Sequence, residues 1–279
     1  MPNKDFQNGL IIGITAGSTR VDTGNVGYQV KFKVDGNDYY VASCRQGESI
    51  TEPPMPTKQG YNFSGWKLNN ANVEFPYTPN EDIEFNASFT DALFLVHFDG
   101  SLQSLPPTTI AEQVNAASYN DAGKFGKCLN NTASTRLSYT TTAMQKTTSQ
   151  SKTIECWVKA SPNANGVICY YTSRLSVFAT ERAVAIQYNG SLLLREEHNI
   201  GANVWYHIAI VFGMSQVRLY INGMLLGTAN QSTSDGSNRL YIYCDASASD
   251  IGSPSVIDEF AIFDGAKYTE NFTPPTAPY

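Results

Sequence analysis

The residues best suited to chemistry in this chain are its acids, because hydrolysis of a glycosidic bond needs two carboxylates facing each other across the sugar. Glu155 is the only acid in its predicted strand. Asp258 and Glu259 are adjacent, and adjacent residues of a strand point to opposite faces of a sheet. Glu196 and Glu197 are adjacent in the same way. The spacing therefore predicts no catalytic carboxylate pair and favours a protein that is not an enzyme.

The other reactive side chains are too scattered to form a metal site or a nucleophile site. The three histidines lie in separate parts of the chain and are expected to be structural: His97, His198 and His207. The sequence contains no Cys-x-x-Cys pair for zinc and no Gly-x-Ser-x-Gly turn for a serine nucleophile. The five cysteines are odd in number and far apart, which argues against a disulfide framework and favours buried free thiols.

Composition indicates a mainly β-structure with about two domains. Of the 279 residues, 12% are aromatic and only 16% are charged, which suits half-buried sheets with Ser, Thr, Asn and Tyr outside. The net charge is −6 and Lys and Arg are dispersed, so neither nucleic acid nor an anionic membrane is a predicted partner. No apolar run approaches the roughly 20 residues of a membrane span. The N-terminus lacks a secretory signal pattern, so assembly in the cytoplasm is expected.

Residues 1–27 form a Gly- and Thr-rich arm that contains the apolar segment GLIIGITAG. Its glycines recur at every fourth position, and so do its apolar residues: Gly9, Gly13 and Gly17, and Phe6, Leu10 and Ile14. On a helix each set would follow one face, where another backbone could pack closely. The β-branched residues equally allow a short strand added to the next domain. Neither form buries its apolar face alone, so we expect the arm to anchor the protein to a partner.

Residues 28–90 have the pattern of a compact β unit. The apolar residues of YQVKFKV at 28–34 alternate with lysines, as in a half-buried strand, and Asp-Gly at 35–36 marks a turn. The segment P-x-x-P-x-x-x-G-Y-x-F-x-G-W at 53–66, with I-x-F-x-A-x-F at 83–89, resembles the internalin B-type repeat. That resemblance implies a small β-grasp-like module with a contact role and an aromatic core of Tyr61, Phe63 and Trp66.

Residues 91–279 contain many short alternating strands separated by Gly, Asn, Ser and Asp. Ordered segments stand out: LFLVHFDG at 93–100, TIECWVK at 153–159, WYHIA at 205–209 leading into VRLYING at 217–223, and IDEFAIF at 257–263. Together they resemble the laminin-G-like, concanavalin-like jelly roll. Its Asn222-Gly223 predicts a tight hairpin, and Trp205 is expected in its core. The chain is thus expected to be all-β: a short N-terminal arm, a β-grasp-like module and a β-sandwich jelly roll.

The jelly-roll resemblance implies two kinds of ligand. Many such domains bind a structural calcium ion, which takes several hard oxygen ligands. Asp99, just after the first strand, and Asp258, just before the last, would come close when these strands pair, so they are the predicted ligands. The alternative is that both acids cap turns. Carbohydrate contact is also implied, and no motif selects among the candidate tyrosines: Tyr170, Tyr171, Tyr188, Tyr241 and Tyr243.

The final segment, residues 257–279, resembles the end of jelly-roll domains in phage structural proteins. That resemblance implies a virion-surface protein: a head fibre, a capsid decoration protein or a tail appendage. Its arm would bind other virion proteins, and its β-modules would adhere to host-surface or environmental glycans. A homo-oligomer such as a trimer is expected. The alternatives are a bacterial cell-surface adhesin and a non-catalytic carbohydrate-binding accessory of a glycan-processing enzyme.

Overall fold

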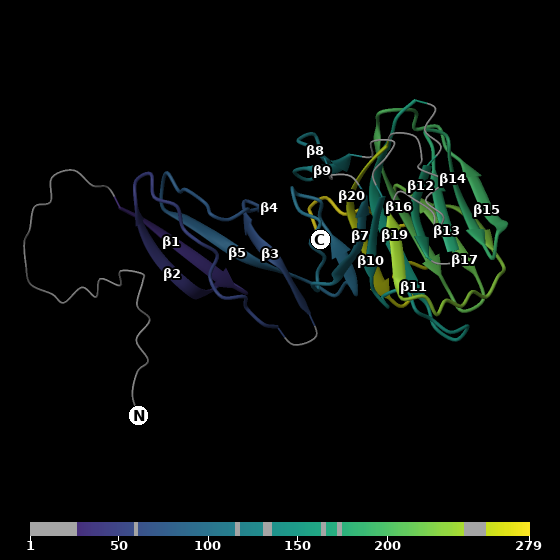
Figure 1. Cartoon of the computed structure of the whole chain (residues 1–279), viewed down its shortest axis with the longest axis horizontal. Coiled ribbons are helices and arrows are strands. Elements are labelled where there is room, and N and C mark those ends of the chain that lie inside the picture. Colours follow the sequence, from purple (N-terminus) through teal and green to yellow (C-terminus); the bar gives the residue numbers. More distant parts are fainter. Residues whose placement is uncertain are drawn as a thin grey trace, which may run out of the picture.

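The computed structural model describes residues 27–58, 61–114, 118–130, 136–162, 166–171, 175–242 and 255–279. The regular structure in these ranges is β-strand, arranged as a small sheet followed by a sandwich (Figure 1). The prediction of an all-β fold is therefore confirmed. The predicted arm anchor, Phe6 to Gly17, lies outside the described residues. Within the described ranges, no helix is long and apolar enough to cross a membrane.

The small domain is a single five-stranded sheet in the order β2-β1-β5-β3-β4. Its strands are β1 (Gly27–Val34), β2 (Asn37–Arg45), β3 (Asn62–Leu68), β4 (Ala71–Asn72) and β5 (Ile83–Thr90). Strands β1 and β5 are parallel, and the other neighbours are antiparallel. The predicted turn joins β1 to β2, with Asp35 and Gly36 at φ of 49° and 81°. Among the described strands, β2 and β4 lie at the two edges of the sheet.

The core of the small domain is a layer of aromatic rings on one face of the sheet. Trp66 is 1% exposed and meets Phe32 edge-on, with ring centroids 4.9 Å apart. Phe63 meets the other side of Trp66 at 5.3 Å. Phe85 is fully buried beside Phe32. Tyr61, expected in this core, is instead 51% exposed.

The large domain is a sandwich of two antiparallel sheets. One is seven-stranded, in the order β15-β14-β13-β12-β19-β10-β7, and the other follows β18-β17-β16-β11-β20-β9-β8 with β6 paired to β20. The bounds are β6 (Phe94–Val96), β7 (Thr109–Val114), β8 (Ser118–Asn120), β9 (Cys128–Asn130), β10 (Arg136–Thr140), β11 (Lys152–Ala160), β12 (Gly166–Tyr171), β13 (Leu175–Ala179), β14 (Ala183–Tyr188), β15 (Ser191–Glu197), β16 (Trp205–Phe212), β17 (Val217–Ile221), β18 (Met224–Ala229), β19 (Arg239–Ile242) and β20 (Ser255–Asp264).

Strand β11 shows why the sandwich forms where the sequence predicts it. Ile154, Cys156 and Val158 point into the core between the sheets, as their alternation indicates. Glu155 and Trp157 occupy the outer face of the same strand. Cys244 lies outside the described residues. The other four cysteines are buried free thiols: Cys44, Cys128, Cys156 and Cys169.

Of two expectations for strands β16 to β18, one is confirmed and the other is wrong. The Asn222-Gly223 turn is present, with φ of 48° and 78°, and joins β17 to β18. Trp205, however, is not a core residue: it is only partly buried at the start of β16. The Lys159 ammonium lies 4.9 Å from its ring centroid instead. Because Trp205 is the first residue of β16, its side chain lies at the end of the sheet and is partly exposed to solvent.

The segment after β20 covers the outer face of the sheet that holds β11 and β16. The Phe272 N–H donates to the Gly223 carbonyl at 2.9 Å, and Phe272 stacks on Tyr268. A Cβ at Gly223 would lie 1.8 Å from the Phe272 carbonyl oxygen, so only glycine permits this approach. The segment ends between the two domains, at the place marked C in Figure 1. Residues on the outer sheet face are therefore buried beneath it.

Candidate functional site

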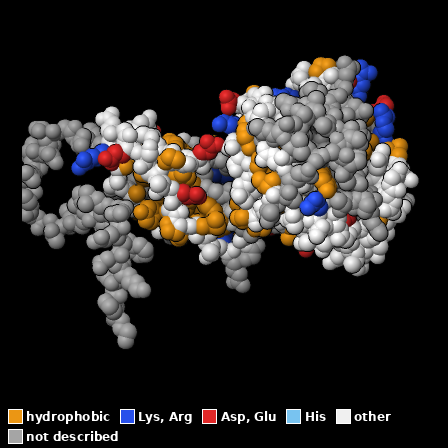
Figure 2. All heavy atoms as spheres, in the orientation of Figure 1, with side chains coloured by type: hydrophobic (Ala, Val, Ile, Leu, Met, Phe, Trp, Pro, Cys, Tyr) orange, Lys and Arg blue, Asp and Glu red, His pale blue; other side chains and the backbone are white. Residues whose placement is uncertain are grey.

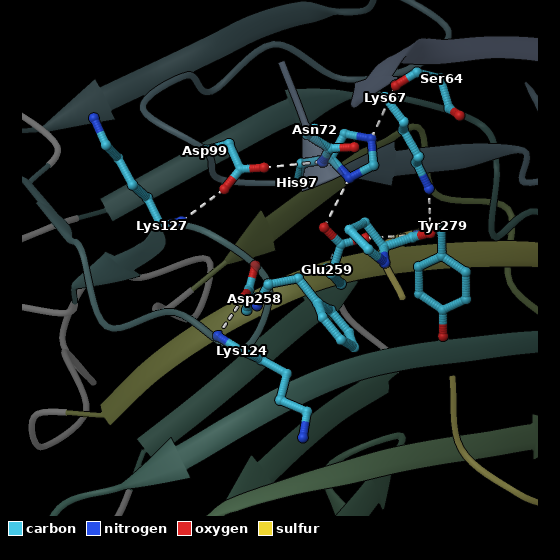
Figure 3. A network of polar contacts seen from close by, with 12 residues as sticks. Ser64, Lys67, Asn72, His97, Asp99, Lys124, Lys127, Asp258, Glu259 and Tyr279 are labelled. Atoms are coloured by element: carbon cyan, nitrogen blue, oxygen red, sulfur yellow. Dashed lines mark hydrogen bonds and ion pairs between the residues drawn. The ribbon is translucent and has the colours of Figure 1, made fainter. Parts of the chain in front are cut away.

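A buried polar network lies where the two domains meet (Figure 3). His97 follows β6, and its Nδ1 lies 2.8 Å from Glu259 Oε1. Its Nε2 lies 3.2 Å from the Ser64 carbonyl oxygen in the small domain. Both partners carry acceptor atoms, so only the protonated imidazole can donate to both of them. Burial lowers the pKa of His97, but Glu259, Asp99 and the Ser64 carbonyl together outweigh burial and the net pKa is raised.

Tyr279 connects the two buried glutamates of this network. Its backbone N–H donates to Glu259 Oε2 at 3.0 Å, and its hydroxyl donates to Glu155 Oε2. Glu155 also lies 3.4 Å from His207 Nε2 and 3.1 Å from Lys267 Nζ. Burial raises the pKa of Glu155, but His207, Lys267 and Tyr279 outweigh it and the net pKa is lowered. Glu155 is therefore an ionised carboxylate held by three partners.

Two further hydrogen bonds tie the small domain to the large one. Lys67 Nζ on β3 donates to the Pro278 carbonyl at 2.7 Å. Asn72 Nδ2 on β4 donates to Asp99 Oδ2 at 2.9 Å. In the connection between the domains Ala92 is 0% exposed and belongs to one apolar cluster with Leu95, whereas Asp91 before it is exposed. The two domains are thus joined by packed and hydrogen-bonded contacts as well as by the chain.

Asp258 and Glu259 do not alternate as their positions on a strand predict. The pairing of β11 with β20 shifts between Glu155 and Trp157, and Glu259 has a φ of 52°. This bulge returns Phe260 to the core while both acids stay outside it. The expectation that they face opposite sides of the sheet is therefore wrong. Burial raises the pKa of Asp258 to about 8, with the charges of Glu259 and Asp99 adding to the effect.

The buried acids are not arranged for hydrolysis of a sugar. Glu155 and Glu259 are both 0% exposed, and Tyr279 fills the space between them with bonds to each. A catalytic acid must reach the proton that it transfers in a bound substrate. These carboxylates bind the end segment of the chain instead, so their role is to hold structure.

The predicted calcium ligands, Asp99 and Asp258, both hold the turn that precedes β9. Asp99 Oδ1 accepts from the Lys127 N–H at 2.7 Å. Asp258 Oδ2 accepts from the N–H groups of Lys124 and Phe125 at 2.7 and 3.0 Å. A calcium ion needs several oxygen ligands, whereas these carboxylates face hydrogen-bond donors. Within the described residues no group of three His, Cys, Asp or Glu side chains could hold a metal. Three of the four carboxylate oxygens thus make the contacts of the turn-capping alternative, and calcium binding stays a prediction.

The tyrosines proposed for sugar contact are not assembled into a site by the described part of the chain. Tyr188 is half-buried, and its hydroxyl donates to the Ser234 carbonyl and accepts from the Ser234 N–H. Tyr241 is 7% exposed. The side chains of Tyr170 and Tyr171, and the whole of Tyr243, lie outside the described residues.

Two surface features were not predicted from the sequence. One is a pocket of about 440 Å³ between the domains, lined by the β3–β4 turn, the 125–127 turn and residues 276–278. The other is an apolar edge on the small domain, where orange side chains gather in Figure 2. Strand β2 contributes three consecutive residues that are 43–46% exposed: Tyr39, Tyr40 and Val41. The run of three apolar residues was visible in the sequence, but only its edge position makes it a surface.

Comparison with known proteins separates the two domains in the same way. Residues 133–270 match the family model described as the concanavalin A-like lectin/glucanases superfamily. Residues 28–90 match the Listeria-Bacteroides repeat domain. No curated protein matches the chain.

Solved structures similar to the chain include botulinum neurotoxin binding domains. The "Botulinum Neurotoxin Type G Receptor Binding Domain" is 16% identical with a TM-score of 0.51, and the match covers 64% of this chain and 49% of that one. A structure titled "Cell entry of botulinum neurotoxin type C is dependent upon interaction with two ganglioside molecules" is 18% identical with a TM-score of 0.50 and the same coverage. The chain spans about half the length of these structures, and the likeness is one of fold. Residues 28–90 are therefore similar to a Listeria-Bacteroides repeat, and residues 133–270 to a concanavalin A-like domain. The sequence predicted the concanavalin/laminin-G-like sandwich, and it predicted a small repeat module over the same residues 28–90.

Proposed function

We propose that this protein is a non-enzymatic binding protein of the phage virion surface. Its arm anchors it to the particle, and its two β-domains contact glycans. The observation that carries the binding role is the junction between the domains, where the buried acids hold His97 and the end of the chain and are not open to a substrate. A rigid pair of domains loses less freedom when it binds than a flexible pair would. The fold is shared with a receptor-binding domain and with a structure whose title names gangliosides, which supports binding rather than catalysis.

The placement on a phage particle rests on the end segment and the arm. Residues 257–279 carry the pattern that resembles phage structural proteins. In this fold their part after β20 covers the sheet and hydrogen-bonds to Glu259 at the junction. Capsid, head fibre and tail remain alternative locations within this proposal. Many copies on one particle would strengthen weak glycan contacts, since linked sites bind at a high effective concentration.

The exposed apolar edge of the small domain supports a contact role in the same proposal. Exposed apolar patches mark interaction sites on soluble proteins. Among the described strands β2 pairs only with β1, so its other edge has backbone groups that a further strand could join. A homo-oligomer such as a trimer is part of the proposal, and sedimentation of the full chain measures it.

Deletion of residues 1–25 tests the anchor. The shortened chain should fold into soluble β-domains, because the described sheets begin at Gly27. It should be absent from purified particles, whereas the full chain produced in the same host is incorporated. Packaging of the shortened chain at normal copy number would show that the arm is not the anchor.

An assay for product release from polysaccharides tests the claim that the protein is not an enzyme. The full chain should release no sugar from glycans to which it adsorbs. If product appears, the variant Glu155→Gln distinguishes the source. Activity that persists in this variant would place catalysis away from the buried network, and either form of activity would contradict the non-enzymatic proposal.

A further inference from the structure

The pocket between the domains has walls of two kinds. Its apolar side is formed by Phe125 together with Ala277 and Pro278. Its polar lining includes Asn69, Asn70 and Glu74 from the small domain and Lys127 from the large domain. A neutral sugar has the same division, because it presents C–H groups on one face and hydroxyl groups around its rim. Binding pockets commonly combine an apolar surface with a few convergent polar groups.

The charges around the pocket favour a neutral ligand. Both oxygens of Asp99 are already engaged, by the Lys127 N–H and by Asn72 Nδ2. The charged groups left to face a ligand are Glu74 and Lys127, which are opposite in sign. Both approach Gly100: a Cβ there would lie 3.0 Å from Glu74 Oε1 and 3.7 Å from Lys127 Nζ. An acceptor and a donor so placed could bind neighbouring hydroxyl groups of one sugar ring.

The pocket is also fixed in shape before any ligand arrives. Asn69 and Asn70 sit in the tight turn between β3 and β4, with φ of 50° and 67°. Phe125 is held by its N–H bond to Asp258 and by edge-on packing against Trp157, with ring centroids 5.9 Å apart. Fixed walls reduce the entropy lost on binding.

We infer that this junction pocket binds one neutral sugar unit, an inference that rests on the proposed glycan-binding function. Phe125 stacks on the C–H face of the ring, and the side chains of Glu74, Lys127 and Asn70 bind its hydroxyl groups. Because the walls come from both domains, bound sugar also bridges the junction.

The three tryptophans give a test with internal controls. Trp157 packs on Phe125, whereas Trp66 lies in the small-domain core and Trp205 at the start of β16. The indole N–H signals of ¹⁵N-labelled full chain are assigned with the Trp66→Phe, Trp157→Phe and Trp205→Phe variants. The probes are the methyl glycosides of glucose, galactose, mannose and N-acetylglucosamine at millimolar concentration. We expect at least one probe to shift the Trp157 signal saturably while the other two signals stay in place.

Two charge-matched variants then locate the binding site. Glu74→Ala should weaken the saturable binding about tenfold, equivalent to 1.4 kcal/mol. Glu81→Ala removes an acid from the same domain outside this pocket and should leave binding unchanged. The inference is overturned if no probe shifts the Trp157 signal, or if Glu74→Ala binds as tightly as the parent chain.

Adsorption of the same proteins to immobilised host-surface polysaccharide separates this inference from the proposed function. Adsorption that is equal for the parent chain and Glu74→Ala keeps the glycan-binding function and rejects the pocket as its site. Adsorption by neither protein, with no Trp157 shift, rejects both. Adsorption that falls with Glu74→Ala alone supports both.

Discussion

The two domains bury their cores by different means. The small domain has one sheet, and aromatic rings centred on Trp66 cover a single face of it. The large domain has two sheets, whose inner faces contribute mainly aliphatic residues to a common core. A domain of about sixty residues buries a smaller share of its surface than a larger one and is marginally stable alone. The comparison indicates that the small domain depends on its docked neighbour, whereas the sandwich is self-sufficient.

Replacement of Trp66 by Ala should have the largest effect, which is to destabilise the small domain while the sandwich stays folded. Loss of a buried aromatic side chain costs about 3–5 kcal/mol, so the small domain should unfold far below its normal temperature. The sandwich should keep its own transition. Calorimetry of the full chain, with fluorescence to follow each domain, measures both.

Phe94→Ala is the matched change in the sandwich, because Phe94 is fully buried beside Tyr139 and Phe260. It should lower the transitions of both domains, since the small domain loses its support when the sandwich unfolds. If Trp66→Ala also lowers both transitions equally, the two domains form one cooperative unit and the asymmetry is absent.

A change of pH tests whether the small domain depends on its contacts with the sandwich, with a smaller expected effect than the core substitutions. The pKa of His97 is raised in the folded chain, so its stabilising contribution is fully present below the ordinary value of 6.5. That contribution is lost as the pH rises through the folded value, because neutral imidazole cannot donate to both Ser64 and Glu259. Hydrogen bonds to charged groups are worth about 1.5–3 kcal/mol. The small-domain transition should therefore fall as pH rises, and His97→Gln should remove most of this slope.

His198→Gln is the matched control for the histidine. Burial lowers the pKa of His198, so its effect on stability has the opposite sign: the folded state is penalised as the pH falls below 6.5. His198 lies after β15 in the sandwich, away from the junction. An unchanged pH slope of the small-domain transition in His97→Gln would show that His97 does not couple the domains.

The elements of both domains could be predicted from sequence because their signals are local. Alternation placed Ile154, Cys156 and Val158 in the core, and Asn222-Gly223 marked its hairpin. The junction could not be predicted in this way. It depends on where residues 264–279 lie after the sheets have formed, and on a bulge at Glu259 that no local pattern announces. The same segment explains why Glu155, on the outer face of its strand, is nonetheless fully buried.

The smallest expected effect comes from Asp258, which lies on the sandwich side of the boundary. Between its ordinary pKa of 3.8 and the folded value of about 8, the folded chain holds a proton that the unfolded chain releases. Stability should therefore fall as pH rises through this window. Asp258→Asn cannot ionise and should lack that slope, while its amide oxygen still accepts from the Lys124 and Phe125 N–H groups. Among the described residues Asp258 Oδ1 has no hydrogen-bond partner. The new NH₂ group takes its place without an acceptor there, which partly offsets the gain at neutral pH. We expect a net stabilisation of about 1 kcal/mol, which raises the melting temperature of the sandwich by about 2–4 °C.

A variant that keeps the pH slope of the parent chain would show that the proton is held elsewhere. A large loss of stability would mean that the Asp258 carboxylate is ionised in the folded protein.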